Sequence, residues 1–227
     1  MFPRFGKARG ADSPGQGNLL DDRSIISYMP RMSTEKKAGY TRARILTTGR
    51  GLARAHGLGC IGLKDKLERS GVPKGSFYYY FSSKEAFGCA LLEDYIDSYL
   101  QRFDALVGEP GSGGDRLMRY FSAWIADDCA DSIADRCLVV KLAAEISDLS
   151  EDMRQVLDAG VAQLVARLSQ LLREGVADGS VRLQPDPDAA AGVLYSQWLG
   201  AAILAKLSKN RTPLHAALAD TRQRLLP

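Results

Sequence analysis

The cysteines and histidines of this 227-residue sequence lack the spacing of a metal site. The six cysteines and histidines are Cys60, Cys89, Cys129, Cys137, His56 and His215. The cysteines show no Cys-x2-Cys spacing, and the two histidines lie far apart. A zinc site needs clustered ligands, so we expect no bound metal and no cofactor. We also expect no disulfide framework, because the sequence shows no export signal.

Long apolar runs are also missing. No stretch resembles the apolar segment of a signal peptide. The longest uncharged run covers 189–205 and is interrupted by Ser196 and Gln197. A membrane-spanning helix needs about 20 apolar residues, so this run is a little short. The sequence therefore predicts a cytoplasmic protein with no membrane partner.

Segments with the two-residue period of β-strands are absent, whereas apolar residues recur at helical spacing after residue 87. Ser150 is the expected N-cap of one long helix, and Asp186 and Thr212, each followed by proline, are expected to cap two others. One expected helix ends before Gly108 and the next opens at Asp115. Another covers 135–146, and a long one runs from Ser150 to about Asp178. The last two begin at Pro187 and at Thr212-Pro213. The fold class is therefore predicted to be all-α.

The most informative segment is 71–87, Gly-Val-Pro-Lys-Gly-Ser-Phe-Tyr-Tyr-Tyr-Phe-Ser-Ser-Lys-Glu-Ala-Phe. Gly71 suits a sharp turn after a short helix over about 63–70, and Pro73 suits the first position of the next helix. Ser82 or Ser83 is a natural N-cap for a longer helix beyond. A helix, a tight turn and a short second helix form a helix-turn-helix unit, whose second helix enters the major groove of DNA.

Several side chains of this unit are suited to contact DNA. Its first residues face the bases and backbone, tyrosine hydroxyls can bind phosphate, and a lysine at the next helix start adds charge. The expected DNA-binding residues are Arg42, Arg44, Lys74, Gly75, Ser76, Tyr78, Tyr79 and Lys84. An ordinary aromatic-rich turn in a helical core is the alternative, and the flanking lysines argue against it.

Charge is distributed unevenly along the chain. Residues 35–84 contain eleven Lys or Arg against three acidic residues, a net charge of +8, whereas 85–227 carry a net charge of −7. A basic segment joined to an acidic one is typical of a nucleic-acid-binding head on a separate body.

The N-terminal part of the chain resembles the N-terminal domain of the TetR family of repressors. The resemblance rests on helix 1 over about 40–56, Gly57-Leu-Gly, helix 2 and the segment 73–87. The resemblance implies a TetR-like all-α fold, with a DNA-binding domain at 35–82 and a helical sensing and dimerisation domain at 83–227. It also implies a transcriptional repressor, not an enzyme, that binds double-stranded palindromic operator DNA as a homodimer.

Residues 1–34 are rich in Gly, Pro, Ser, Asp and Arg and lack helical periodicity, so we expect a disordered extension. Met32 resembles an ordinary translation start, so the preceding residues need not be translated. A second interpretation is a basic arm that reaches into the minor groove. Its cations would be Arg4, Lys7, Arg9, Arg23 and Arg31.

The uncharged run over 189–205 also points to a homodimer. A helix with so few polar positions must be buried on nearly all sides. The simplest arrangement packs one side on its own core and the other on a second subunit. Two heads on a twofold axis would then read a palindrome whose half-sites are about one helical turn apart.

Cys137 is the candidate sensor. If Asp135 caps a helix, Cys137 lies in its first turn near Arg136 and Lys141, where the helix dipole and both cations would favour the reactive thiolate. Residues 137–154 and 193–206 further resemble a branch of the TetR family that responds to reactive electrophiles. That resemblance implies that Cys137 is the sensing thiol for an electrophile or oxidant and that Lys206 forms a reversible covalent link with it. The same resemblance implies that Cys129 is a secondary thiol.

Two other interpretations remain open. The body could bind a lipophilic small molecule non-covalently in a pocket formed by Phe103, Tyr120, Trp124 and Trp198. Alternatively, Cys137 could be the nucleophile of a thiol enzyme, although no Cys/His/Asp arrangement has supporting local context.

Overall fold

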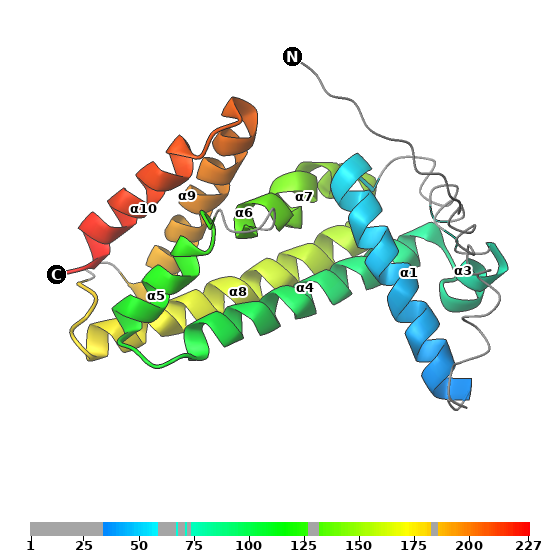
Figure 1. Ribbon diagram of the computed structural model, residues 1–227, viewed down its shortest axis with the longest axis horizontal. Coiled ribbons are helices and arrows are strands. Elements are labelled where there is room, and N and C mark those ends of the chain that lie inside the picture. Colours follow the sequence, from blue (N-terminus) through cyan, green and yellow to red (C-terminus); the bar gives the residue numbers. More distant parts are fainter. Residues whose placement is uncertain (1–33, 59–66, 68–70, 72–73, 127–131, 183–185) are drawn as a thin grey trace, which may run out of the picture. The chain divides into compact units, whose positions relative to one another are not determined.

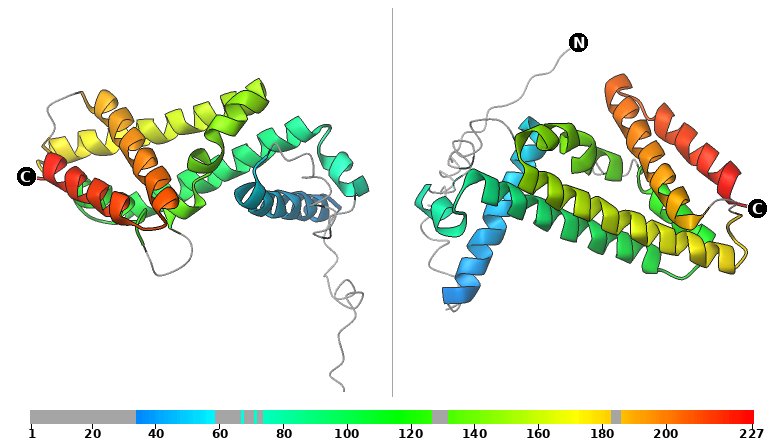
Figure 2. Two further views of the ribbon diagram at one scale, coloured as in Figure 1. Left: turned by 90° about the horizontal axis from the view of Figure 1, so that it is seen from above. Right: turned by 180° about the vertical axis from the view of Figure 1, so that it is seen from behind.

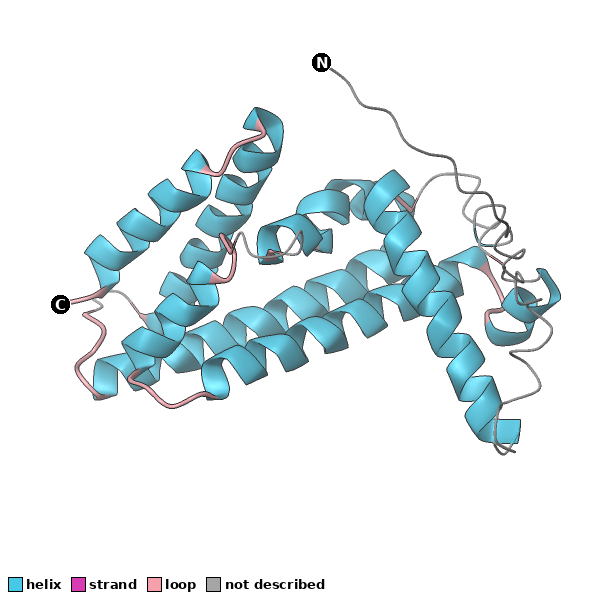
Figure 3. Cartoon of the chain, in the orientation of Figure 1, coloured by secondary structure: helices cyan, strands magenta, loops and turns pink. Residues whose placement is uncertain are grey.

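The computed structural model describes residues 34–58, 67, 71, 74–126, 132–182 and 186–227. The described residues form helices and loops without any β-strand, which confirms the predicted fold class (Figure 3). The predicted helix over 63–70 and Pro73 lie outside the described residues, except for the buried Leu67.

The predicted DNA-binding domain contributes α1 (Thr34–His56) and α3 (Lys74–Tyr80). Phe77 and Phe81 are buried and pack edge-on against Phe87, with ring centroids 5.1 and 4.9 Å from it. Gly49 of α1 is required at this contact, because a Cβ there would lie 2.5 Å from the Phe87 ring. This aromatic cluster holds α1, α3 and the start of the next helix together.

Two long helices, α4 (Lys84–Gly108) and α8 (Glu151–Ala177), run side by side in the same direction (Figures 1 and 2). The predicted N-caps are confirmed, since Ser83 accepts a hydrogen bond from the Ala86 N–H and Ser150 accepts one from the Met153 N–H. Gly160 of α8 lets Ile96 of α4 approach, because a Cβ at residue 160 would overlap that side chain. Close packing therefore fixes the register of the pair.

The helix α5 (Gly113–Ser122) begins earlier than predicted. Ser112 caps it, and Asp115 is the third helical residue of a capping box in which its carboxylate accepts from the Ser112 N–H. The prediction that a helix opens at Asp115 was wrong because Gly113 and Gly114, read as loop residues, are tightly packed helical residues.

The segment predicted as one helix over 135–146 is two helices. They are α6 (Ile133–Arg136) and α7 (Leu138–Leu149), separated at Cys137, whose φ and ψ are extended. Ser132, not Asp135, caps α6.

The last two helices are α9 (Pro187–Ser208) and α10 (Thr212–Leu225). Asp186 caps α9 as predicted, but Thr212 does not cap α10: it is the first helical residue, and its N–H donates to the Asn210 side chain. Among the described helices, α9 alone is long and apolar enough to cross a membrane by length and composition. It packs against α8 and α10, however, as a core helix does, and leaves one apolar side exposed. That side consists of Val193, Ile203, Leu204 and Leu207.

Candidate functional site

The exposed tyrosines of α3 are held in place by the aromatic cluster beneath them. Tyr79 is 77% exposed and Tyr78 is 48% exposed, whereas Phe77 and Phe81 on the opposite side of the helix are buried. The short helix thus presents two phenol hydroxyls to solvent on a rigid base. Such hydroxyls can donate hydrogen bonds to phosphate oxygens.

The predicted DNA-binding cations are exposed on α1 and at the start of α4. Lys84 is exposed in the first turn of α4, next to the cap residue Ser83, and Arg44 is exposed on α1. Arg42 of α1 lies over the Phe81 ring, with the guanidinium carbon 5.5 Å from the ring centroid, which fixes its direction. Lys74, Gly75 and Ser76 form the first turn of α3. The predicted DNA-binding residues with described side chains are therefore all exposed.

Cys137 lies at the joint between α6 and α7. Its sulfur accepts a hydrogen bond from the Val140 N–H at 3.5 Å, so the cysteine itself is the N-cap of α7. The predicted position in a first turn capped by Asp135 was wrong, because the chain breaks its helix at this residue. The thiol is 1% exposed.

Burial dominates the acidity of this thiol. Removal from water raises the pKa of Cys137, while hydrogen bonds from the Val140 N–H and the Tyr95 hydroxyl, and the charge of Lys206, lower the pKa by less. The predicted stabilisation of the thiolate is thus outweighed by burial, and the cation that acts on the sulfur is Lys206, not Lys141.

Lys206 comes from α9 and reaches the α6–α7 joint. Its ammonium donates to the Asp135 carbonyl at 3.4 Å, and Arg211 holds the Asp135 carboxylate at 3.1 Å. Lys206 and Arg211 thus both contact Asp135, although they follow it by 71 and 76 positions in the sequence. Cys129, the predicted secondary thiol, lies outside the described residues.

We expect the Lys206→Met variant to alkylate more slowly at Cys137. Loss of the positive charge raises the pKa of the thiol further, so at pH 7.5 the thiolate fraction and the rate should fall about two- to tenfold. The rate of wild type should still be rising at pH 9, because the pKa already lies above its ordinary value. Mass spectrometry of the peptide that contains Cys137 measures the rate.

Lys141→Met is the matched control, since Lys141 lies one turn along α7 and is exposed. It should leave the rate nearly unchanged. Equal slowing by both variants would contradict a specific role for Lys206.

A cavity of about 490 Å³ lies beside α4 and α5. Two of the four predicted pocket residues, Phe103 and Tyr120, line it together with Tyr99. Trp124 and Trp198 do not line this cavity. They are fully buried in a neighbouring aromatic cluster, with ring centroids 5.7 Å apart.

Contacts between residues far apart in the sequence join the end of α1 to α7 and the middle of α1 to α4. Gly57 ends α1 with a φ of 83°, and a Cβ there would lie 2.6 Å from the Glu145 carboxylate of α7. Arg50 of α1 pairs with Asp94 of α4 at 3.2 Å and donates to Ser98 at 3.1 Å. The sequence contained no signal for these contacts, because helical periodicity does not tell which faces meet.

The described part of the chain contains no group of three His, Cys, Asp or Glu side chains that could hold a metal ion. The described side chains near Cys137 instead offer a phenol, an ammonium group and main-chain N–H groups. This arrangement can tune the reactivity of a single thiol.

Both the N-terminal and the C-terminal part of the chain match known protein families. Residues 45–88 match the model of bacterial regulatory proteins of the tetR family, and residues 113–220 match a tetracyclin repressor-like C-terminal domain. The HTH-type transcriptional repressor NemR of Escherichia coli is 42% identical over 184 residues, which cover 80% of this chain and 92% of NemR. The transcriptional regulator AcuR of Cereibacter sphaeroides is 34% identical over 215 residues, covering 94% of this chain and 87% of AcuR.

A solved structure gives the same result. The crystal structure of the reduced form of E. coli NemR has a TM-score of 0.75 and 41% sequence identity, and the match covers 82% of this chain and 97% of that one.

Proposed function

The chain belongs to the TetR family of bacterial transcriptional regulators, and from this premise we propose that it releases its operator when Cys137 is modified by a reactive electrophile or oxidant. It is a TetR-type repressor related to NemR, and such proteins bind operator DNA as dimers and are not enzymes. The observation that carries the proposal is the buried Cys137 thiol, held between Tyr95 of α4 and the Lys206 charge of α9.

The thiolate of Cys137 is the reacting species. With a maleimide, the sulfur bonds to one alkene carbon, the electron pair moves to the neighbouring carbon, and a proton adds there. With hypochlorous acid, chlorine transfers to sulfur and hydroxide leaves. The Lys206 ammonium gives up a proton to water, and its amine nitrogen then displaces chloride from sulfur. A second proton leaves as the sulfur–nitrogen bond forms. Two equivalents of thiol reduce that bond, restoring Cys137 and Lys206 and forming a disulfide.

Modification must displace helices because the sulfur is buried. An adduct or a new bond to Lys206 does not fit the present packing of α6 and α7, so these helices shift. Glu145 of α7 lies against Gly57 at the end of α1, so a shift of about 1–2 Å would reach the DNA-binding helices. In a dimer, such a shift changes the spacing between the two α3 helices, and operator affinity falls.

The dimer would form through the exposed apolar side of α9 defined above. Val193, Ile203, Leu204 and Leu207 recur at helical spacing, and all four are exposed in the single chain. Burial against a second copy removes this apolar surface from water. The boundary between the DNA-binding domain and the sensing domain after residue 82 is part of the proposal, and the repressor would act in the cytoplasm, where its operator is.

The test is operator release by wild type and the Cys137→Ser variant. In a mobility-shift assay on the upstream region of its own gene, N-ethylmaleimide or hypochlorite should weaken binding by wild type at least about tenfold. Added thiol should restore binding after hypochlorite but not after the maleimide. The Ser variant should stay bound in both treatments.

Cys89→Ser is the matched control. Cys89 is half-buried on α4, where burial and the charges of Asp152 and Glu85 raise its pKa, so its loss should leave release intact. Release by Cys137→Ser to the same extent as wild type would sink the proposal.

The cavity beside α4 and α5 supports a second candidate function, induction by a non-covalent lipophilic ligand. Its volume of about 490 Å³ and its lining by Tyr99, Phe103 and Tyr120 are typical of small-molecule sites. Under this alternative, Cys137→Ser would respond normally to the ligand.

A further inference from the structure

The helix break at Cys137 changes the hydrogen-bond partners of the backbone on both sides of it. In a continuous helix the Asp135 carbonyl would accept a hydrogen bond from the N–H of residue 139. The break instead turns the Val139 N–H toward the Cys137 sulfur. The Asp135 carbonyl accepts from the Lys206 ammonium at 3.4 Å. One feature of the backbone therefore serves both the sulfur and the lysine.

The Asp135 side chain is held from two sides. One of its carboxylate oxygens accepts from the Ser132 hydroxyl at 2.7 Å and from the Arg211 guanidinium at 3.1 Å. Ser132 is the buried cap of α6, and Arg211 directly precedes α10. The ion pair thus ties α6 to the turn that follows α9, the helix that carries Lys206.

The position of Lys206 matters for only one of the two reactions proposed for Cys137. Addition to a maleimide needs the thiolate and no amine. After hypochlorous acid has transferred chlorine to the sulfur, two nucleophiles compete for it. The neutral Lys206 amine displaces chloride and loses a proton, which gives the sulfur–nitrogen bond. Water displaces chloride and loses a proton, which gives a sulfenic acid. An amine held beside the sulfur is favoured because its effective concentration is high.

We propose that Asp135 is a positioning residue for Lys206. Held by Ser132 and Arg211, it directs the chlorinated sulfur to the sulfur–nitrogen link and away from sulfenic acid. This role rests on the proposed sensing by Cys137 and adds the side chains that select its product. Thiols reduce the link, whereas a sulfenic acid can be oxidised further to acids that thiols do not reduce. The ion pair therefore keeps the switch reversible in the presence of excess oxidant.

Substitutions at the ion pair test this role without opening the core. The side chains of Asp135 and Arg211 are 44% and 29% exposed, and pairs this exposed contribute little to stability. Asp135→Asn keeps the size of the side chain and removes its charge, and Arg211→Gln removes the charge of the partner. Both variants should therefore fold like wild type.

Mass spectrometry of peptides after hypochlorite treatment measures the product. Wild type should give mainly a peptide pair linked between Cys137 and Lys206. Asp135→Asn and Arg211→Gln should each give about tenfold less link and correspondingly more sulfenic acid trapped by dimedone. The rate of alkylation by N-ethylmaleimide should change by less than about twofold in both, because that reaction does not use the amine.

Two further variants identify the ion pair as the cause. The double variant Asp135→Asn/Arg211→Gln should lose no more link than either single variant, because the two side chains act as one pair. Arg211→Lys keeps the positive charge and should retain most of the link. A purely structural effect of losing the arginine would not be rescued by lysine.

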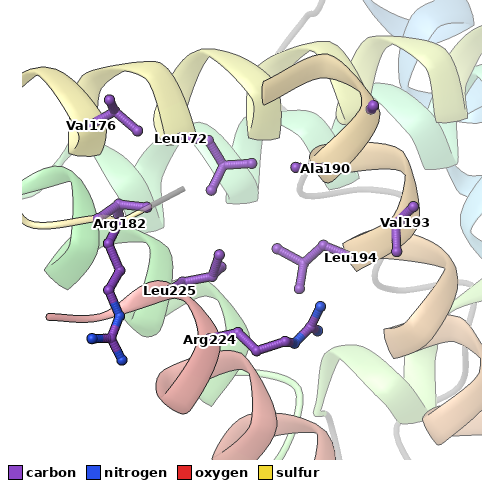
Figure 4. Close-up of a pocket in the computed structure, with 10 residues that line it drawn as sticks. Leu172, Val176, Arg182, Ala190, Val193, Leu194, Arg224 and Leu225 are labelled. Atoms are coloured by element: carbon purple, nitrogen blue, oxygen red, sulfur yellow. The ribbon is translucent and has the colours of Figure 1, made fainter. Parts of the chain in front are cut away.

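Arg224→Gln is the matched control on the same helix. Arg224 lies near the end of α10, beside a groove of about 740 Å³ that is lined in part by leucines of α8, α9 and α10 (Figure 4). It pairs with Asp220 at 2.7 Å and donates to Gln197 of α9. The substitution therefore also removes one charge and one contact between α10 and α9, but its link yield should equal that of wild type.

Several outcomes would overturn the positioning role of Asp135. They are a wild-type yield of link in Asp135→Asn and Arg211→Gln, an equal loss in Arg224→Gln, or a slowing of alkylation as large as the loss of link. If hypochlorite released the operator through Cys137 while wild type formed no link, the positioning role would fail and the thiol sensor would stand. Release by Cys137→Ser to the same extent as wild type would overturn both.

Discussion

The double variant Tyr79→Ala/Lys84→Ala is expected to bind operator DNA about a hundredfold more weakly than wild type. Tyr79 is the most exposed aromatic residue of α3, and Lys84 stands at the exposed start of α4, where main-chain N–H groups also face outward. Each substitution removes one predicted phosphate contact, and a dimer loses each contact twice. Fluorescence anisotropy with a labelled operator fragment measures the loss.

The salt dependence of binding identifies the lost contacts. Removing one lysine from each subunit should reduce the slope of log K against log salt by about 2, because each neutralised phosphate contributes about 0.9. Lys209→Ala is the charge-matched control at the end of α9, and its slope should equal that of wild type. An unchanged slope in the double variant would mean that Lys84 does not contact phosphate.

The sequence predicted features that depend on neighbouring residues. Ser83, Ser150 and Asp186 are the N-caps that the sequence indicated, because capping needs one side chain and an N–H three residues on. The aromatic anchors Phe77 and Phe81 were equally predictable from their spacing. Local chemistry thus determined these three helix starts.

Features that depend on packing were less accessible. The break at Cys137 and the early start of α5 at Gly113 both reflect tertiary contacts that override local pattern. Only the family resemblance predicted that Lys206 lies near the α6–α7 joint. Lys206 and Asp135 are 71 positions apart, and no local pattern indicates such a contact. The direction of the Cys137 pKa shift depends on burial, which charge counting near the residue cannot supply.

Trp198→Ala should lower the free energy of unfolding by about 3–5 kcal/mol, the usual loss when a fully buried aromatic side chain is truncated. Trp198 of α9 is 0% exposed and stacks on Phe121 of α5 with ring centroids 4.6 Å apart. Its indole N–H donates to the Thr221 hydroxyl of α10 at 3.1 Å. One side chain therefore joins three helices, and its loss leaves a cavity at their centre.

Trp198→Phe separates the two parts of this effect. The phenyl ring keeps the stacking on Phe121, and Thr221 keeps its own hydrogen bond to the Ala217 carbonyl, so the loss should be about 1–2 kcal/mol. Urea unfolding at one fixed protein concentration measures both variants, because dimerisation makes apparent stability depend on concentration. A Trp198→Ala variant that unfolds like wild type would contradict a role for Trp198 in the core. It would favour the alternative from the sequence, in which Trp198 lines a ligand pocket. The gradient from Trp to Phe to Ala thus tells a structural role from a binding role at the same position.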